Sequence, residues 1–344
     1  MKILYLSFTN LDHSSNPVYI KGLRQNGAEV LTCHDSLAQI IKYYFANRHG
    51  ADYIFVGVDN PTLVLWLKLI SRKPIAYYAL CSVIERLIIS RSLAAKNSPK
   101  YWFYWLEDFL ACHFSKLVMV ESEHQKDFFA KTFYLDKSKL FVARTGVDDD
   151  KFSYDSALKK SDTFTVIFRG RLLPEAGAEY AVRAAKQLEN QNIRFIMHAF
   201  GQELPKIQKL ISELKPQNLE LITDFLPIER VREQMQKAHL SLGQLGNHDR
   251  LNRTIPHKAY ESIALGLPYL TARNPGVLEL LKENETCLAF NPADADDLAA
   301  KILWAKDHPQ ELERMANNAY ELYKTQLTPK ILAKSFIDNL DKNH

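Results

Sequence analysis

Apolar residues in the first half of the chain form short runs separated by segments of helical periodicity. The runs fall at 3–8, 30–33, 53–58, 74–78, 117–121 and 140–143. Between them we expect helices, including 17–25, 37–45, one starting at Pro61 and a long one at 101–114. Near-continuous apolar runs that alternate with helices are typical of parallel strands covered on both faces. The pattern predicts a doubly wound α/β domain over residues 1–152.

The second half repeats this alternation. Strands are expected at 164–168, 193–199, 219–223, 240–242, 268–271 and 287–290. Helices are expected at 178–188, 228–236, around Glu261, and at 277–281, 296–305, 310–323 and 329–340. Together with the polar stretch 153–163, which reads as a linker, this predicts a second α/β domain over 160–327.

Composition narrows the class of protein. A chain of 344 residues with 47% apolar and 24% charged residues fits two ordinary globular domains. A net charge of +4 is too small to indicate nucleic-acid binding. The 4 cysteines form no Cys-x-x-Cys pair, and we expect reduced core thiols in a cytoplasmic protein. The acidic run Asp148–Asp150 reads as a solvated turn, so no metal site is expected.

Residues 253–281 carry the clearest functional signal. Ile255-Pro256-His257-Lys258 opens a helix that contains Glu261 and ends at Gly266. Proline is favoured at a helix start, and glycine at its left-handed cap. The unpaired N–H groups and partial positive charge of such a helix start suit a phosphate group.

This stretch resembles the donor-site signature of retaining nucleotide-sugar glycosyltransferases of family 4. The shared positions are Pro256, Lys258, Glu261, Ala264, Gly266 and Pro268, followed by Gly276-Val277-Leu278-Glu279-Leu280. The resemblance implies the GT-B fold, in which two Rossmann-like domains face each other across a cleft. It also implies that the last helix, about 328–342, packs back on the first domain. A plain βα unit is the alternative interpretation.

Further motifs extend the resemblance. Gly170-Arg171-Leu172 is similar to the family motif whose Arg and Lys hold the donor diphosphate, and Arg side chains bind phosphate through two parallel bonds. The turn at Gly201 and the residues Phe225 and Leu226 correspond to positions around the nucleotide. Glu261 corresponds to the carboxylate that accepts bonds from ribose hydroxyls. The implied donor-binding set is Gly170, Arg171, Gly201, Phe225, Leu226, Pro256, His257, Lys258 and Glu261.

Two positions depart from the family pattern. Ala176 stands where the motif has Lys, and Arg253 stands where many members have a Glu eight residues before Glu261. One hypothesis is that Arg253, with Lys258, supplies the missing positive charge. The alternative is that Arg253 is a surface residue of a loop. The residues expected to carry catalysis are therefore Arg171, Glu261 and Arg253.

The acceptor side is less defined. Ligands of parallel α/β sheets bind at the carboxyl ends of the strands, which suggests His13, Ser14, Ser82, Glu85 and Arg91. Residues 86–106 combine four basic residues with the run Tyr101-Trp102-Phe103-Tyr104-Trp105 and contain no acidic residue. Such a segment favours the headgroup zone of a membrane, and a surface loop leading into a sheet-packed helix is the alternative.

The resemblance implies metal-independent transfer of a sugar, with retention, from a UDP- or GDP-sugar to a glycan, lipid or lipid-linked acceptor, without a cofactor. We expect a role in cell-surface polysaccharide or glycolipid synthesis, in the cytoplasm or peripherally on the inner face of the membrane. The alternatives are a donor-binding homologue without catalysis, for which Ala176 argues, and a nucleotide-sugar epimerase or hydrolase on the same fold.

Overall fold

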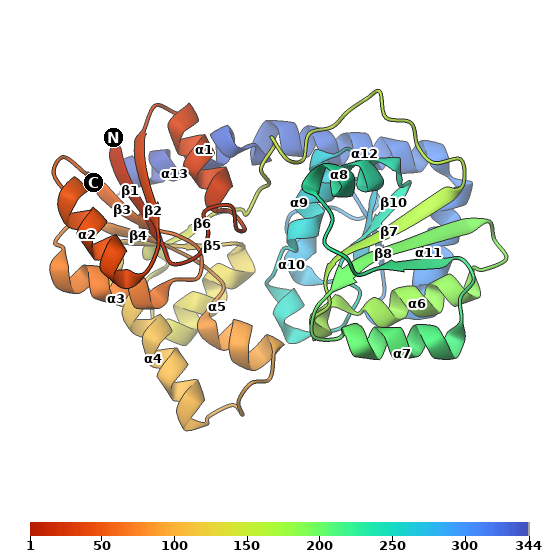
Figure 1. Cartoon of the computed structure of the whole chain (residues 1–344), viewed down its shortest axis with the longest axis horizontal. Helices are drawn as coiled ribbons and strands as arrows, with labels where there is room; N and C mark the ends of the chain where they lie inside the picture. Colours follow the sequence, from red (N-terminus) through yellow and green to blue (C-terminus); the bar gives the residue numbers. More distant parts are fainter. Residues whose placement is uncertain (343–344) are drawn as a thin grey trace. The chain divides into compact units, whose positions relative to one another are not determined.

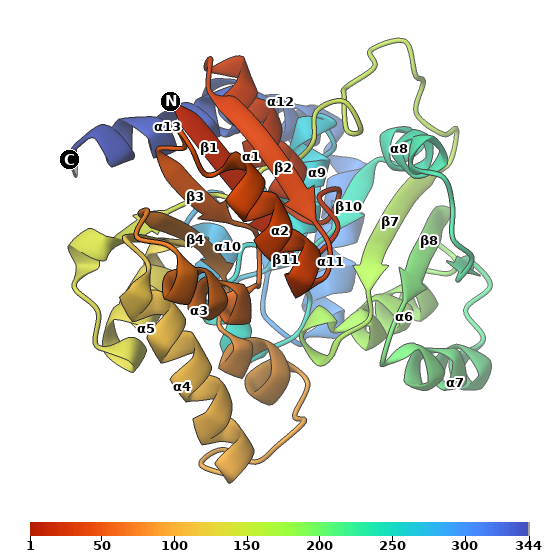
Figure 2. The ribbon, with the colours of Figure 1, turned by 60° about the vertical axis from the view of Figure 1, so that its left-hand side comes forward.

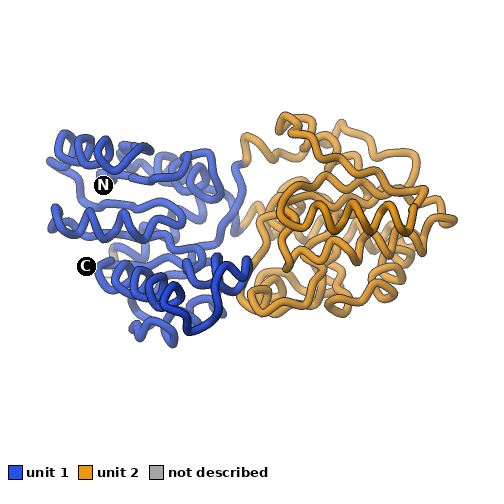
Figure 3. Tube along the Cα trace, turned by 60° about the horizontal axis from the view of Figure 1, so that its bottom comes forward, with its two compact units in different colours: residues 1–148, 326–344 blue, residues 149–325 orange. Residues whose placement is uncertain are grey.

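A computed structural model describes residues 1–342 of the chain. The chain divides into two compact units, shown in blue and orange in Figure 3. Unit 1 comprises Met1–Asp148 with the C-terminal segment from Gln326, and unit 2 comprises Asp149–Thr325. Each unit contains one parallel six-stranded sheet, so the α/β fold class predicted from the strand–helix alternation is confirmed.

The sheet of unit 1 has the strand order β2-β1-β3-β4-β5-β6, and all of its pairings are parallel. Its strands are β1 (Lys2–Ser7), β2 (Glu29–His34), β3 (Tyr53–Val56), β4 (Ile75–Leu80), β5 (Leu117–Val120) and β6 (Leu140–Val142). The four interior strands β1, β3, β4 and β5 bury nearly every side chain, which explains why they read as continuous apolar runs.

The helices of unit 1 are α1 (Asn16–Gln25), α2 (Leu37–Asn47), α3 (Pro61–Ile70), α4 (Pro99–Phe114), α5 (Glu123–Phe133) and α13 (Pro329–Lys342). One core cluster joins α2, α3, α4 and α5 to the sheet. The rings of Tyr19 (α1), Phe55 (β3) and Phe336 (α13) form a second aromatic group. Figures 1 and 2 show the strands between these two groups of helices.

Helix α13 packs directly against α1. A Cβ atom at Gly22 would lie 1.9 Å from the carbonyl oxygen of Pro329, so only glycine permits this approach. Asn26 adds a side-chain bond of 2.8 Å to the Lys330 carbonyl. The chain therefore returns to unit 1 after completing unit 2.

Unit 2 has the strand order β12-β11-β10-β7-β8-β9, again all parallel. Its strands are β7 (Phe164–Arg171), β8 (Ile193–Phe200), β9 (Leu219–Ile222), β10 (Leu240–Leu242), β11 (Tyr269–Ala272) and β12 (Leu288–Phe290). Its helices are α6 (Ala178–Gln187), α7 (Leu204–Leu214), α8 (Ile228–Lys237), α9 (His257–Ala264), α10 (Pro275–Leu278), α11 (Ala295–Asp307) and α12 (Pro309–Leu322).

Two segments differ from the sequence-based expectation. The helix α7 was not predicted, and residues 84–90 form a π-helical segment, η1 (Ile84–Ser90), where a loop was one of the two expectations. Glu85 within η1 is fully buried, and its carboxylate accepts bonds from Ser82 Oγ (2.9 Å) and Gln125 Nε2 (2.5 Å). These tertiary bonds hold the segment.

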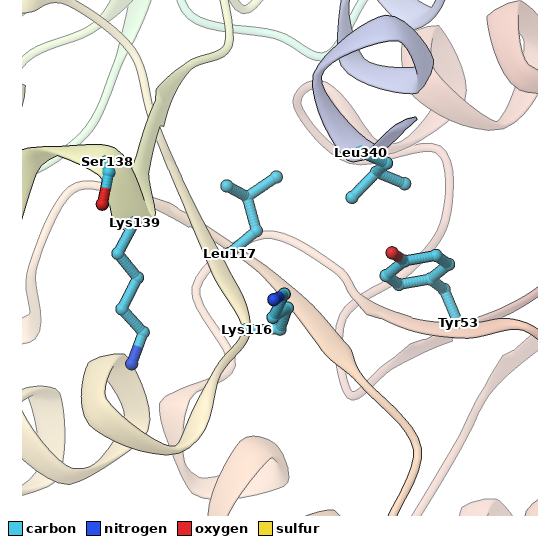
Figure 4. A pocket seen from close by; sticks show the side chains of 6 residues that line it. All are labelled: Tyr53, Lys116, Leu117, Ser138, Lys139 and Leu340. Atoms are coloured by element: carbon cyan, nitrogen blue, oxygen red, sulfur yellow. The ribbon is translucent and has the colours of Figure 1, made fainter. Parts of the chain in front are cut away.

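Unit 1 contains a pocket at the amino ends of its strands. It has a volume of about 130 Å³ and is lined by Tyr53, Lys116, Leu117, Ser138, Lys139 and Leu340 (Figure 4). Because ligand pockets usually enclose about 300–1,000 Å³, this pocket is too small for a nucleotide sugar. Within residues 1–342, no helix has the length and apolar character needed to cross a bilayer. The four cysteines are free thiols.

The contact between α1 and α13 makes a prediction about Gly22. Gly22→Ala should lower the melting temperature although alanine is the better helix former, because overpacking a tight contact costs about 1–3 kcal/mol. Gln25→Ala, at an exposed position of the same helix, is the matched control. A Gly22→Ala protein as stable as this control would contradict the described packing of α13.

Candidate functional site

The candidate site of unit 2 is built around the end of β7 and the start of α9. Strand β7 ends with Arg169-Gly170-Arg171, which pairs in register with His198-Ala199-Phe200 of the neighbouring strand β8. Gly170 and Gly201, at the carboxyl ends of these strands, have positive φ angles of 136° and 127°. The ends of β7 and β8 therefore present basic and aromatic side chains beside two glycines with positive φ angles.

Gly201 must be a glycine for a steric reason. A Cβ atom there would lie 2.9 Å from Arg171 Cγ and 3.0 Å from the carbonyl oxygen of Leu172. The exposed Arg171 guanidinium lies 5.9 Å from the centroid of the Phe200 ring. The turn at Gly201 thus lets the stem of Arg171 pass close to β8 while its charged group faces solvent.

A buried ion pair connects β7 to α9. Arg169 donates a hydrogen bond to Glu261, and His257 Nδ1 lies 3.4 Å from the other carboxylate oxygen. Burial alone would raise the pKa of Glu261, but the Arg169 charge and the His257 bond outweigh it and lower the pKa to about 2. Glu261 is therefore ionised at neutral pH.

Lys258 lies beneath this ion pair rather than in solvent. Its Nζ is 4.0 Å from the centroid of the Phe168 ring and 3.4 Å from the carbonyl oxygen of Gly243. Its Cε would be 3.4 Å from a Cβ at Gly170. Burial lowers the pKa of Lys258 to about 7, so this lysine is only partly charged at neutral pH.

The helix start itself is formed as follows. Pro256 is the N-cap of α9 and has extended backbone angles, so it precedes the first helical residue, His257. The Ala259 N–H group donates a hydrogen bond of 2.8 Å to the Pro256 carbonyl oxygen. The first N–H groups of a helix have no partner within it, so those of His257 and Lys258 have no acceptor within α9. The helix is buried from Lys258 to Ala264.

The loop between β10 and α9 covers the turn after β7. Leu245 N–H bonds to the carbonyl of Ala176 at 3.0 Å, and a Cβ at Gly177 would lie 2.3 Å from Gly246 N. Arg250 donates to the buried Glu175 carboxylate at 2.8 Å, immediately beside Ala176. The alanine that replaces the motif lysine is itself buried in the core.

Arg253 belongs to the same loop. Its guanidinium donates to the Asp249 carboxylate at 2.7 Å, and its side chain is 11% exposed. Arg253 is therefore held in place and is not a freely moving surface residue. Gly276, at the start of α10, approaches it closely, because a Cβ there would lie 2.8 Å from the Arg253 carbonyl carbon.

The predicted residues of unit 2 thus fall into two groups. Gly170, His257, Lys258 and Glu261 meet around Arg169, whereas Arg171 and Gly201 meet beside Phe200. Phe225 follows β9 and is 97% exposed, and Leu226 is half-buried. The His198 imidazole bonds to the Asp224 carbonyl at 3.1 Å, and burial lowers its pKa. Arg169, Arg250 and His198 were not singled out from the sequence.

The acceptor-side candidates lie in unit 1. His13 is exposed and Ser14 half-buried, in the loop after β1 where Ser14 adopts φ 55°. Arg91 follows η1 and is half-buried. Ser82 and Glu85 are buried and bonded to each other, so in this structure they brace the turn after β4 and offer no exposed surface to a ligand.

Comparison with known proteins places unit 2 in a family. Residues 149–322, just over half of the chain, match the family described as glycosyl transferases group 1. The chain belongs to this family. The matched range lies within unit 2 and includes every residue of the two groups described above.

Individual relatives are more distant. The putative colanic acid biosynthesis glycosyltransferase WcaL of Salmonella typhimurium is 24% identical over 196 residues, which are 56% of this chain and 47% of the relative. The alpha-D-kanosaminyltransferase of Streptomyces kanamyceticus is 27% identical over 46% of this chain and 40% of its own length. The chain therefore spans about half the length, or less, of these curated relatives.

Solved structures extend the similarity to the whole chain. Anabaena HepE, in complex with UDP and glucose, gives a TM-score of 0.73 at 16% identity and covers 99% of this chain and 100% of its own. Sucrose-phosphate synthase from Thermosynechococcus elongatus gives 0.79 at 13% identity, covering 99% of both chains. The two parallel sheets with their surrounding helices thus form the GT-B fold.

The buried lysine makes a prediction about stability and pH. The pKa of Lys258 is about 7 in the folded protein, below its ordinary value of 10.5, so the unfolded chain binds more protons between these limits. The contribution of Lys258 to the free energy of unfolding should therefore rise as the pH increases from 7 to 10. The melting temperature of the wild type should rise relative to Lys258→Met over this range, whereas the exposed Lys237→Met should show a constant difference. Parallel profiles for all three proteins would contradict the burial of the Lys258 ammonium group.

Proposed function

We propose that the protein is a retaining glycosyltransferase that moves a sugar from a nucleotide-diphosphate sugar to a hydroxyl acceptor. The acceptor oxygen forms a bond to the anomeric carbon while the bond from that carbon to the diphosphate oxygen breaks. The leaving phosphate oxygen takes the acceptor's proton. No metal ion or resident cofactor is part of this proposal.

The observation that carries the proposal is the buried, ionised Glu261 beside the start of α9. A carboxylate held by Arg169 and His257 keeps lone pairs for two vicinal hydroxyls, the arrangement that a ribose offers. Arg171 and the N–H groups at the start of α9 would stabilise the charge that develops on the diphosphate as the sugar leaves. Phe225 and Leu226 would contact the base.

The comparisons suggest a substrate class. The HepE structures contain UDP, UDP with glucose, or UDP-glucose, which favours a UDP-sugar over a GDP-sugar as the donor. WcaL and the amylovoran biosynthesis glycosyltransferase AmsK of Erwinia amylovora carry names that point to polysaccharide synthesis. We therefore favour a growing cell-surface saccharide as the acceptor, with His13, Ser14 and Arg91 as the accessible candidates on the acceptor side.

The donor proposal predicts the effect of two substitutions. Arg171→Ala and Glu261→Gln should each weaken UDP binding by about tenfold to a hundredfold, since a hydrogen bond to a charged group contributes about 1.5–3 kcal/mol. Isothermal titration with UDP, GDP and ADP measures the change, and Arg194→Ala, an exposed arginine of β8, is the control. Equal affinities for wild type and both variants would exclude this donor site.

Turnover separates the proposal from its alternatives. With a UDP-sugar and a saccharide acceptor, a transferase forms UDP only as fast as it forms the glycoside. An epimerase or hydrolase would change the sugar nucleotide without acceptor. A homologue without catalysis would bind UDP and release no product.

We further propose that Arg253 supplies the diphosphate with the charge that is missing at Ala176. Lys258 is a weaker source, because its burial leaves it only partly protonated at neutral pH. Arg250, bonded to Glu175 beside Ala176, is the competing candidate.

This assignment predicts a difference between two loop arginines. Arg253→Ala should weaken UDP binding about tenfold or more and Arg253→Lys should restore part of the loss, because the lost contact is to a charged phosphate. Arg250→Ala, from the same loop, serves as the comparison in the same titration. Undiminished affinity in Arg253→Ala, with loss in Arg250→Ala, would move the role to Arg250.

A further inference from the structure

Helix α4 of unit 1 buries a carboxylate and leaves some of its large apolar side chains exposed. Asp108 is 1% exposed, and its carboxylate accepts bonds from Val83 N–H (3.1 Å) and Ile84 N–H (3.3 Å). Trp102, Phe103 and Leu106, in contrast, are 52%, 65% and 48% exposed. Burial raises the pKa of Asp108, yet the helix keeps this residue inside. Tyr101, Tyr104, Trp105 and Phe109 are half-buried against the core of unit 1, so only part of the apolar surface of α4 is exposed.

The exposed apolar residues share one face of α4. Spacings of three and four residues place Trp102, Phe103 and Leu106 on neighbouring positions of a helix surface. The buried residues of the helix are Asp108, Ala111 and Cys112. These residues, together with the half-buried Trp105 and Phe109, attach the helix to unit 1 and leave Trp102, Phe103 and Leu106 exposed among the described residues.

Basic side chains border this face. Lys96 and Lys100 are both exposed, and the Lys100 ammonium lies 5.9 Å from the centroid of the Tyr104 ring. The exposed Leu93 precedes them in the loop between η1 and α4. No acidic residue occurs from Arg86 to Leu106. We call Leu93, Lys96, Lys100, Trp102, Phe103 and Leu106 the basic aromatic surface.

The basic aromatic surface projects from unit 1, and ring contacts hold part of it. The Trp102 ring has edge contacts with Tyr101 (5.3 Å) and Trp105 (5.8 Å), and Ser98 caps the helix through a 3.2 Å bond to Tyr101 N–H. In Figures 1 and 2 the start of α4 and the loop before it form the tip of this unit, away from its strands. Trp102 and Phe103 are therefore accessible to a binding partner without a rearrangement of unit 1.

We propose that the basic aromatic surface binds the headgroup zone of an anionic lipid bilayer. Trp and aliphatic side chains enter the boundary between headgroups and acyl chains, while the lysines remain with the lipid phosphates. Lys96 and Lys100 match an anionic surface. The carboxylate that follows on the helix, Glu107, is half-buried and accepts a hydrogen bond from Thr62. Protein–protein interfaces, in contrast, are depleted of lysine relative to the rest of the surface. The proposal does not depend on the sugar-transfer activity.

Vesicle sedimentation of the full chain tests this proposal. The wild type should bind vesicles of phosphatidylcholine mixed with phosphatidylglycerol, bind pure phosphatidylcholine weakly, and be released by high salt. Lys96→Glu with Lys100→Glu should lower the partition coefficient by more than about tenfold, because each basic residue near the surface contributes about fivefold. Trp102→Ser with Phe103→Ser should lower it at low salt as well.

Matched controls are available in unit 2. Phe225→Ser removes an exposed aromatic ring, and Lys209→Glu reverses an exposed charge, so neither should change vesicle binding. Circular dichroism and melting curves verify that the variants remain folded. Wild-type protein that does not sediment with either vesicle, or variants that bind as tightly as wild type, would overturn the proposal. A concentration-dependent dimer that the same substitutions abolish would assign the surface to a second copy instead.

Discussion

The ion pair between Arg169 and Glu261 is the interaction on which the organisation of unit 2 depends. It joins the end of strand β7 to helix α9, which begins 86 residues after that strand ends. Neither of the two side chains is largely exposed. Removing two charges from water is costly unless further bonds satisfy them. His257 supplies one such bond, and the Phe152 ring, 5.5 Å from the Arg169 guanidinium, covers the cation. The start of α9 is thereby fixed relative to Arg171, two residues beyond Arg169.

Burial, and not the sequence motif, determines which basic side chains near the start of α9 carry a full positive charge. Lys258 occupies a motif position that suggests a phosphate-binding cation, yet its surroundings of Phe168 and Gly170 favour the neutral amine. Arg171, in contrast, keeps a solvent-exposed guanidinium group. Residue 176 is a buried alanine, and Lys258 is only partly protonated at neutral pH. The arginines of the loop before α9 are the remaining local source of fixed positive charge.

The sequence predicted most strands and helices correctly because parallel strands are uniformly apolar and their helices alternate with them. It failed where tertiary contacts override local composition. Helix α7 is amphipathic, but only Ile207 is fully buried and a proline follows its first residue, so its signal is weak. Segment η1 carries the isoleucine-rich stretch of a strand and is held as a π-helix by Glu85 and Asp108, which bond across 40 and 24 or 25 residues.

Among the candidate site residues, too, some could be predicted from local sequence and others depend on tertiary contacts. Arg171, Lys258 and Glu261 could be located from a motif with fixed spacing, since the spacing reflects one strand end and one helix start. Arg169 could not, because its partner is 92 residues away and nothing in the local sequence distinguishes it from a solvated arginine. The burial of Lys258 was equally hidden, since it results from Phe168 of β7 and Gly243 after β10.

A buried carboxylate serves two different purposes in the two units. Glu261 is ionised because Arg169 and His257 compensate its charge, and an ionised carboxylate can accept bonds from hydroxyl groups of a ligand. Asp108 lies without a basic side chain among its described hydrogen-bond partners, and burial raises its pKa, so its bonds to Val83 and Ile84 act as a structural attachment. Together with the packing of Trp105 and Phe109 against the core, that attachment holds α4 with Trp102, Phe103 and Leu106 exposed.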